Sequence, residues 1–294
     1  MVSSWSARVM SILDQFKAFV TERHNIYLRR VAGKPAPWTD DPMLREYKFT
    51  NIYRELDRTT VWCKKNVRDK YADHSYANLA WSIIAFRFFN RIETGEAIFN
   101  SGAWDQYLKS KDTSILRNVI LKMRGKGPYT TGAYIIKTVN GKNKLDGALW
   151  AIDHALPVAI ELAEYAEAKG YFLSEAQEIL LKAPYLGSFM AAQLIADMKY
   201  TKLFPTNKVE DWHTWAASGP GSRRGLNILN DADIEHPWRE KEWLAELGIL
   251  RNMIIPMFEE YGWEIPHAQD VQNMLCEFSK YQRGYSRNKF VPSK

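Results

Sequence analysis

Residues 183–198, APYLGSFMAAQLIADM, decide the fold of this chain. Two apolar helical runs flank a tight turn, in which Pro184 restricts φ and Gly187 permits φ > 0 and a close backbone approach. The pattern is typical of a helix-hairpin-helix, which points backbone N–H groups and a helix N-terminus at a phosphate and so anchors nucleic acid without reading its sequence. We therefore assign Tyr185, Gly187 and Ser188 to DNA binding. An ordinary helix–helix turn is the alternative.

Outward from this turn, the pattern is helical almost throughout. Apolar residues at i, i+3 and i+4 predict helices at roughly 5–22, 49–69, 76–92, 112–123, 149–168, 173–182, 188–198, 239–259 and 267–282. Ser174 with Gln177 predicts a capping box. The best strand signal is 132–139 (GAYIIKTV), which the turn dipeptide Asn140-Gly141 would close as a short hairpin. We expect an all-α fold, with two helical lobes and a groove between them.

Composition supports a sizeable core and a polyanionic partner. The 294 residues are 46% hydrophobic, the net charge is +6 and the sequence pI is about 9.1, although a mild basic excess alone is a weak signal. We divide the chain into an N-terminal helical extension (1–44), a catalytic domain (45–285) with a lobe division near 125–147, and a basic tail (286–294). Lys280, Arg283 and Arg287 alternate with Tyr281 and Tyr285, which suits phosphate contact with stacking; a frayed, solvated tail is the alternative.

Several chemistries are excluded by what the sequence lacks. The two cysteines, Cys63 and Cys276, form no CxxC or zinc spacing, so we expect no metal, no disulfide and a cytoplasmic protein. No GxxxxGK followed by Ser or Thr, no GxGxxG and no GxSxG occurs, so nucleotide-driven kinase chemistry and a bound cofactor are not expected. No apolar run approaches the roughly 18 residues of a membrane span.

A carboxylate pair, Glu210-Asp211, follows the hairpin by about twenty residues and is expected to open a new helix. Its functional interpretation is a general base at a pocket rim, with Trp212 and Trp215 as stacking walls. The alternative is that carboxylates in a first helical turn simply stabilise the helix N-terminus.

The segment 218–227, SGPGSRRGLN, is expected to be a surface loop that binds an anion. Its glycines let several N–H groups converge, and its two arginines add forked positive charge, which together suit a phosphate or pyrophosphate. The predicted pyrophosphate ligands are Gly219, Gly221, Ser222, Arg223 and Arg224. A flexible loop with solvated arginines is the alternative.

Two further segments gather polar side chains on one helical face. Helical spacing aligns Asn51, Arg54 and Asp57 in the first segment and Asp270, Asn273 and Glu277 in the second. An ion pair and a plain amphipathic helix, respectively, are the alternatives to a site. The predicted pocket for the base and an amine comprises Asn51, Arg54, Asp57, Trp212, Trp215, Asp270 and Asn273.

Five of these stretches together resemble one family. FTNIYRELDRTT, APYLGSFMAAQLIADM, VEDW, GPGSRRGLN and DVQNMLCEFSKYQR are similar to the α-glutamyl/putrescinyl thymine pyrophosphorylases. That group is related to the helical domain of 5-hydroxymethyluracil DNA kinases and to helix-hairpin-helix DNA glycosylases. The resemblance covers roughly residues 45–285. It implies a glycosylase-like helical fold and a phage enzyme that hypermodifies thymine in double-stranded DNA.

The chemistry that this resemblance implies has two steps. 5-Hydroxymethyluracil in DNA is first converted to a pyrophosphorylated form, and an amine, from an amino acid such as glycine or from a polyamine, then displaces the pyrophosphate. Because this sequence lacks a P-loop, the resemblance implies the second step, with the base flipped out of the duplex. Asp211 is then the first choice of base and Glu210 the second.

Two alternatives remain open at this stage. One is a monofunctional DNA glycosylase that excises a modified pyrimidine, and the other is a non-catalytic DNA-binding helical module. Bifunctional glycosylases place a lysine two residues after the hairpin glycine; Phe189 stands there in this chain, which argues against strand nicking.

Overall fold

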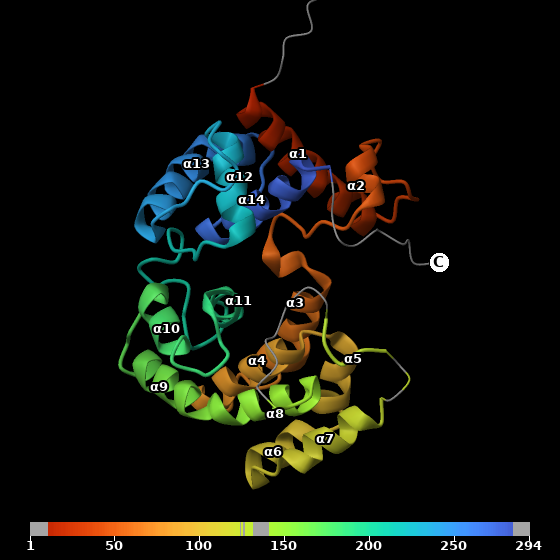
Figure 1. Cartoon of the computed structure of the whole chain (residues 1–294), viewed down its shortest axis with the longest axis vertical. Helices are drawn as coiled ribbons and strands as arrows, with labels where there is room; N and C mark the ends of the chain where they lie inside the picture. The colour runs from red at the N-terminus through yellow and green to blue at the C-terminus, as the bar shows by residue number, and fades with distance from the viewer. Residues whose placement is uncertain (1–10, 124, 126, 132–140, 285–294) are drawn as a thin grey trace, which may run out of the picture. The chain divides into compact units, whose positions relative to one another are not determined.

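The computed structural model describes residues 11–123, 125, 127–131 and 141–284, and Figure 1 shows helices joined by irregular segments. Within those residues every regular element is a helix and no strand occurs, so the predicted all-α class is confirmed. The predicted strand at 132–139 lies outside the described residues.

Two compact units divide the chain. Unit 1 combines Met1–Arg54 with Ala216–Lys294, and unit 2 is the continuous segment Glu55–Trp215. The predicted catalytic domain, 45–285, therefore has residues in both units, and the segment near 125–147 lies inside unit 2.

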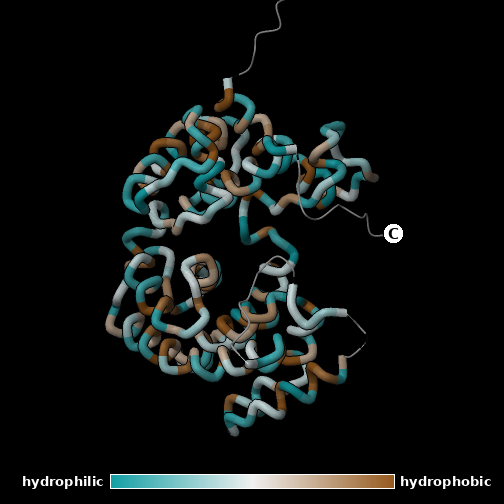
Figure 2. Tube along the Cα trace, in the orientation of Figure 1, coloured by the Kyte–Doolittle hydropathy of each residue, from teal (hydrophilic) through white to brown (hydrophobic). Residues whose placement is uncertain are grey.

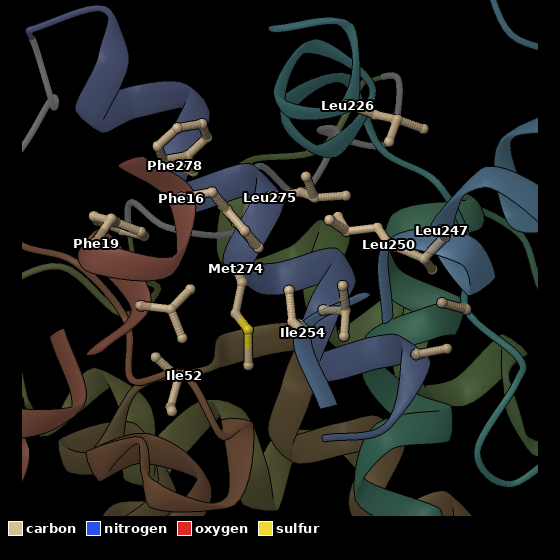
Figure 3. Close-up of a cluster of buried hydrophobic side chains, with 14 of the residues drawn as sticks. Phe16, Phe19, Ile52, Leu226, Leu247, Leu250, Ile254, Met274, Leu275 and Phe278 are labelled. Carbon is tan, nitrogen blue, oxygen red and sulfur yellow. The ribbon is translucent and has the colours of Figure 1, made fainter. Parts of the chain in front are cut away.

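Unit 1 is built on a single apolar core. Its helices are α1 (Ile12–Val31), α2 (Pro42–Glu46), α12 (Pro220–Leu229), α13 (Glu240–Glu260) and α14 (Ala268–Gln282). Figure 3 shows Phe16, Phe19, Met274 and Phe278 among the side chains that meet in this core. Apolar residues alternate with polar ones along these helices (Figure 2), so each helix buries one face.

Unit 2 is organised around α4, which is apolar on all sides and almost entirely buried, as expected of a central helix. Helices α8, α9 and α11 pack against it. The elements of unit 2 in chain order are η1 (Arg54–Leu56, at the junction with unit 1), α3 (Arg58–Cys63), η2 (Lys64–Arg68), α4 (Tyr76–Phe89), α5 (Ile92–Gly95), η3 (Glu96–Asn100), α6 (Ala103–Ser110), α7 (Thr113–Leu121), α8 (Lys144–His154), α9 (Leu156–Glu167), α10 (Leu173–Leu180) and α11 (Ser188–Met198).

Some predicted elements differ from the observed ones. The single helix expected at 149–168 is two helices, α8 and α9, because Pro157 near the start of α9 has no N–H to continue the ladder. The helix expected at 49–69 starts only at Arg58. The predicted capping box of Ser174 is absent, since α10 begins at Leu173 without a side-chain cap from its own N-cap residue.

Two local predictions around the candidate site were wrong. Residues 210–214 form turns instead of a new helix. The segment expected as an anion-binding loop is the first turns of α12, which starts at Pro220. Pro at the first helical position is favoured there because its fixed φ suits a helix and its missing N–H has no partner in that turn anyway.

Candidate functional site

The turn between α10 and α11 has the order of elements that the sequence predicted. Its strained residue is Tyr185, with a φ of +63°, whereas Gly187 has a φ of −84° and starts α11 as its N-cap. The expectation that Gly187 supplies a positive φ or a close approach is therefore wrong, since among the described residues nothing lies within 4 Å of a Cβ built there. Because glycine has no side chain, Gly187 leaves the start of α11 without a side-chain cap. Ser188 accepts a hydrogen bond from Gln177 Nε2 at 3.1 Å.

Asp211 holds the N-terminus of α10 from a distant part of the chain. Its Oδ1 accepts the backbone N–H of Leu173 at 2.7 Å, and its Oδ2 accepts that of Ser174 at 3.0 Å. A carboxylate at this position neutralises the exposed first-turn N–H groups and interacts favourably with the helix dipole. Glu210 is exposed and is linked to the same region by its backbone N–H, which donates to the Tyr171 carbonyl.

The two tryptophans predicted as stacking walls are core residues. Trp212 is 2% exposed and Trp215 is 5% exposed. The buried ammonium of Lys199 donates to the Trp212 carbonyl at 2.9 Å and lies 4.4 Å from the centre of its ring, while Tyr200 packs edge-on against it. A base cannot stack on either indole as the structure stands, so these rings stabilise the segment that carries Asp211.

A buried ion pair, not predicted from the sequence, joins α4 to α11. Arg87 and Asp197 are 1% and 0% exposed, and the Arg87 guanidinium donates hydrogen bonds to both carboxylate oxygens of Asp197. The same guanidinium donates to Asn90 Oδ1 at 2.6 Å and to Thr60 Oγ1 at 3.1 Å. One sequence signal could have predicted this pair: the apolar runs FRFF and LIADM each contain a single charged residue. Charged side chains are almost never buried without a partner, so each of these two needs one.

A second ion pair lies close to the first. Arg68 donates to both oxygens of Glu55, at 2.9 and 2.6 Å, and to the Asp197 carbonyl at 3.3 Å. Burial and the nearby Asp197 raise the pKa of the Cys63 thiol to about 12, so this cysteine is not a nucleophile at neutral pH. Asp57, predicted as part of a pocket, is the N-cap residue of α3 and makes no side-chain cap bond.

In unit 1, the structure brings together four of the predicted pocket residues. Asp270 accepts the backbone N–H of Arg54 at 3.2 Å, and Asn273 Nδ2 donates to the Asn51 carbonyl at 3.0 Å. Glu277, one turn further along the same face of α14, accepts the N–H of Thr50 at 3.1 Å.

The predicted alignment of these three α14 side chains is thus observed. What they hold is the backbone of residues 50–54. Arg23 adds a bond to the side chain of Asn51 at 2.9 Å. The cluster therefore fixes an irregular segment against α14, and a role in binding a base or an amine stays a prediction.

The start of α12 is occupied by groups of the chain itself. The Ser222 hydroxyl accepts the N–H of Gly219 at 3.0 Å. Arg223 pairs with Glu240 at 3.0 Å, and Arg224 pairs with Glu235 at 2.7 Å. Both arginines are partly exposed and form ion pairs at the surface, and a pyrophosphate would have to displace two glutamates.

The glycines of this segment serve close helix packing. A Cβ built at Gly221 would lie 2.4 Å from Cys276 Sγ, and one at Gly225 would lie 2.3 Å from the Leu275 carbonyl oxygen. Only glycine therefore lets α12 approach α14 this closely.

The basic end of α14 is partly committed to internal contacts. Lys280 pairs with Glu277 at 2.5 Å and lies over the Phe49 ring. Arg283 Nε donates to the Ser279 carbonyl at 3.1 Å. Arg287 lies outside the described residues.

Neither a metal cluster nor a membrane helix is found in the part of the chain that the structure describes. There, no three His, Cys, Asp or Glu side chains gather closely enough to hold a metal ion. No helix of that part combines the length and apolarity needed to cross a membrane.

Comparison with known proteins gives one family. The helical domain of 5-hmdU DNA kinase matches residues 10–289. A 5-hmdU DNA kinase of Bacillus phage SP10 is 27% identical over 316 residues, covering 94% of this chain and 46% of the relative, so the chain spans less than half of that relative's length. No solved structure matches. On the extent of the family match, the chain belongs to the family of the helical domain of 5-hmdU DNA kinases.

Proposed function

We propose that this protein acts on thymine derivatives in phage DNA and displaces pyrophosphate from 5-(pyrophosphoryloxymethyl)uracil with an amine. The observation that carries the proposal is the family match over residues 10–289 in a sequence without a P-loop motif. The matching relative is called a 5-hmdU DNA kinase, yet these residues offer no glycine-rich phosphate cradle for ATP. They are therefore suited to handling the modified base rather than to phosphorylating it. Such a protein would work in the cytoplasm of the infected cell.

The reaction needs a base and a site for the leaving group. The amine nitrogen bonds to the 5-methylene carbon as the C–O bond to pyrophosphate breaks, and the ammonium that forms gives its extra proton to a carboxylate. Asp211 is the proposed acceptor. It is partly exposed, and each of its oxygens accepts one N–H from α10, which leaves further lone pairs for a proton.

Pyrophosphate departure is assigned to Arg223 and Arg224, which must exchange Glu240 and Glu235 for phosphate oxygens. Forked guanidinium groups suit phosphate oxygens, and they stabilise charge that develops on the leaving group. The proposed amine is an amino acid or a polyamine. The mass of the product nucleoside identifies which one is used.

The test is to incubate DNA that carries the pyrophosphorylated base with the protein and a panel of amines. The DNA is then digested to nucleosides, whose masses are measured by mass spectrometry. An amine-substituted nucleoside and free pyrophosphate are the expected products. Release of the modified base would show a glycosylase, and DNA binding without any product would show a binding module. Either result would overturn the proposal.

Asp211→Asn tests the base within that assay, with Glu210→Gln as its matched control. We expect the first variant to keep DNA binding and to lose roughly 10²- to 10⁴-fold in rate, with partial rescue at higher pH, where the amine is already deprotonated. The control should stay active.

The amide of the Asp211→Asn variant has one acceptor oxygen for two N–H groups, so the cap of α10 weakens as well. A thermal unfolding curve measures that loss, expected to be about 1 kcal/mol. If stability and DNA binding are lost together, Asp211 is a helix cap only. If the variant is as active as wild type, Glu210 or Asp270 becomes the leading candidate.

A further inference from the structure

The hairpin keeps an aromatic residue where the backbone favours glycine. Tyr185 adopts a φ of +63°, a conformation that glycine adopts freely and that side chains with a Cβ adopt at a cost. Of the five non-glycine residues with positive φ in the described parts of the chain, the other four are Asn, Asp and Lys. A strained conformation of this kind is typical of a position where the side chain has a use beyond packing.

The Tyr185 ring does not pack into the core. It is 37% exposed and meets Trp150 of α8 edge-on, with ring centres 5.6 Å apart. Trp150 is itself stacked on the exposed His154, at 3.8 Å between ring centres. Phe189, in the first turn of α11, is 45% exposed. We call Trp150, His154 and Tyr185 the aromatic tip.

The aromatic tip adjoins the start of α11, which has no side-chain cap. Helix α11 begins at Gly187 without a side-chain cap, and Ser188 and Phe189 in its first turn are exposed. The N-terminal N–H groups of a helix attract anions. A flat apolar surface next to an anion-attracting helix start is complementary to a nucleotide, whose base is flat and whose phosphate is negative.

We propose that the aromatic tip stacks on an unpaired DNA base. The proposal rests on DNA being the substrate, as proposed above. It gives the hairpin a second task besides holding the backbone, because stacking selects a base that has left the duplex. Stacking on aromatic side chains is sequence-tolerant, since every base has a π-face.

The test compares two fluorescent oligonucleotides of about twelve nucleotides, one of thymidine and one with the same backbone but no bases. Wild-type protein should bind the thymidine strand about tenfold more tightly, which is the range expected for stacking of one base. The Tyr185→Gly variant should lose that preference. Its unfolding temperature should not fall below that of wild type, because glycine relieves the backbone strain, and its salt dependence should be unchanged, because no phosphate contact is removed.

Leu181→Ser is the matched control, since Leu181 is equally exposed, at 37%, at the same end of the hairpin but has no ring. It should keep the base preference. Equal binding of the two strands by wild type, an unchanged preference in Tyr185→Gly, or an equal loss in Leu181→Ser would overturn the proposal. The nucleoside mass assay separates the two proposals. Amine transfer without a base preference that depends on Tyr185 would contradict only the proposed role of the aromatic tip. A base preference without amine transfer would contradict only the proposed reaction.

Discussion

Helices α11 and α12 both start at a glycine, and the two starts differ in what surrounds them. In unit 1, the start of α12 is closed, because the Ser222 hydroxyl accepts the N–H of Gly219 and a Cβ at Gly221 would lie 2.4 Å from Cys276 Sγ of α14. In unit 2, the start of α11 is open, because Gly187 has no close neighbour among the described residues and provides no side-chain cap.

The difference teaches that a glycine near a helix start has two separate explanations. In α12, glycine removes a Cβ so that two helices can touch, and the neighbouring arginines are neutralised by glutamates. In α11, glycine leaves backbone N–H groups exposed. Of the two sequences, the one that looked more like an anion site, with two arginines and three glycines, has the more closed structure.

The largest expected effect is on the stability of unit 2, through the ion pair that anchors α11. Asp197 lies near the end of α11 and is paired with Arg87 of α4 in a buried site. We expect Arg87→Met to destabilise unit 2 by about 3–5 kcal/mol, since it leaves a buried carboxylate without its partner. Urea unfolding measures the loss.

The double variant Arg87→Met/Asp197→Leu is its control. Removal of both charges should restore much of the stability, because no buried charge is then left unpaired. If the single variant unfolds at the same urea concentration as wild type, the pair does not anchor α11.

The close packing of α12 on α14 and the open start of α11 should respond differently to one added methyl group. Gly225→Ala should cost about 1–3 kcal/mol, because its Cβ would lie 2.3 Å from a backbone oxygen. Gly187→Ala should cost no more than about 1 kcal/mol, the range of an N-cap change, since its Cβ meets nothing. The two urea midpoints check this, and equal losses would contradict the distinction drawn between the helices.

Inhibition by pyrophosphate shows whether the start of α12 can open to an anion. Arg223→Ala and Arg224→Ala should each weaken inhibition of the reaction by pyrophosphate, by about tenfold, which is about 1.4 kcal/mol. Glu240→Gln and Glu235→Gln should strengthen it, because each frees an arginine from its internal partner. Inhibition constants that no variant changes would remove the assignment of pyrophosphate to this helix.

The last effect is gradual, a pH dependence of stability that His24 brings to unit 1. Burial, and secondarily the charge of Arg23, lower the pKa of His24 from 6.5 to about 4. The folded state therefore holds a neutral imidazole, and as pH falls below 6.5 the unfolded chain takes up the proton first. Stability should be full above pH 6.5 and should fall by up to about 1 kcal/mol per pH unit until about pH 4.

Hydrogen exchange of α1 amides, followed from pH 7 down to pH 4, measures this loss, and α4 amides of unit 2 serve as the internal reference. His24→Gln should flatten the α1 profile relative to that of α4. If the α1 profile of the variant keeps the slope of wild type, the acid sensitivity has another source.

Local sequence alone determined a good part of this protein. The apolar spacing of 188–198 predicted α11 at the bounds Ser188–Met198, and the spacing of Asp270, Asn273 and Glu277 predicted their common face on α14. Both follow from the 3.6-residue period of a helix, which any short stretch displays by itself. The same short-range pattern failed at 149–168, where apolar spacing continued through Pro157 and concealed a break.

Only the tertiary structure decided what the charged side chains do. The N-terminus of α10 is held by Asp211, 38 residues further along, and Arg87 meets Asp197 across 110 residues. The arginines of α12 find Glu235 and Glu240 on the segment that folds back over them. The sequence shows only that a charged side chain needs a partner or water. It does not show which partner, because Coulomb attraction and hydrogen bonding depend on distance in space. Partner choice therefore appears only once the helices are packed.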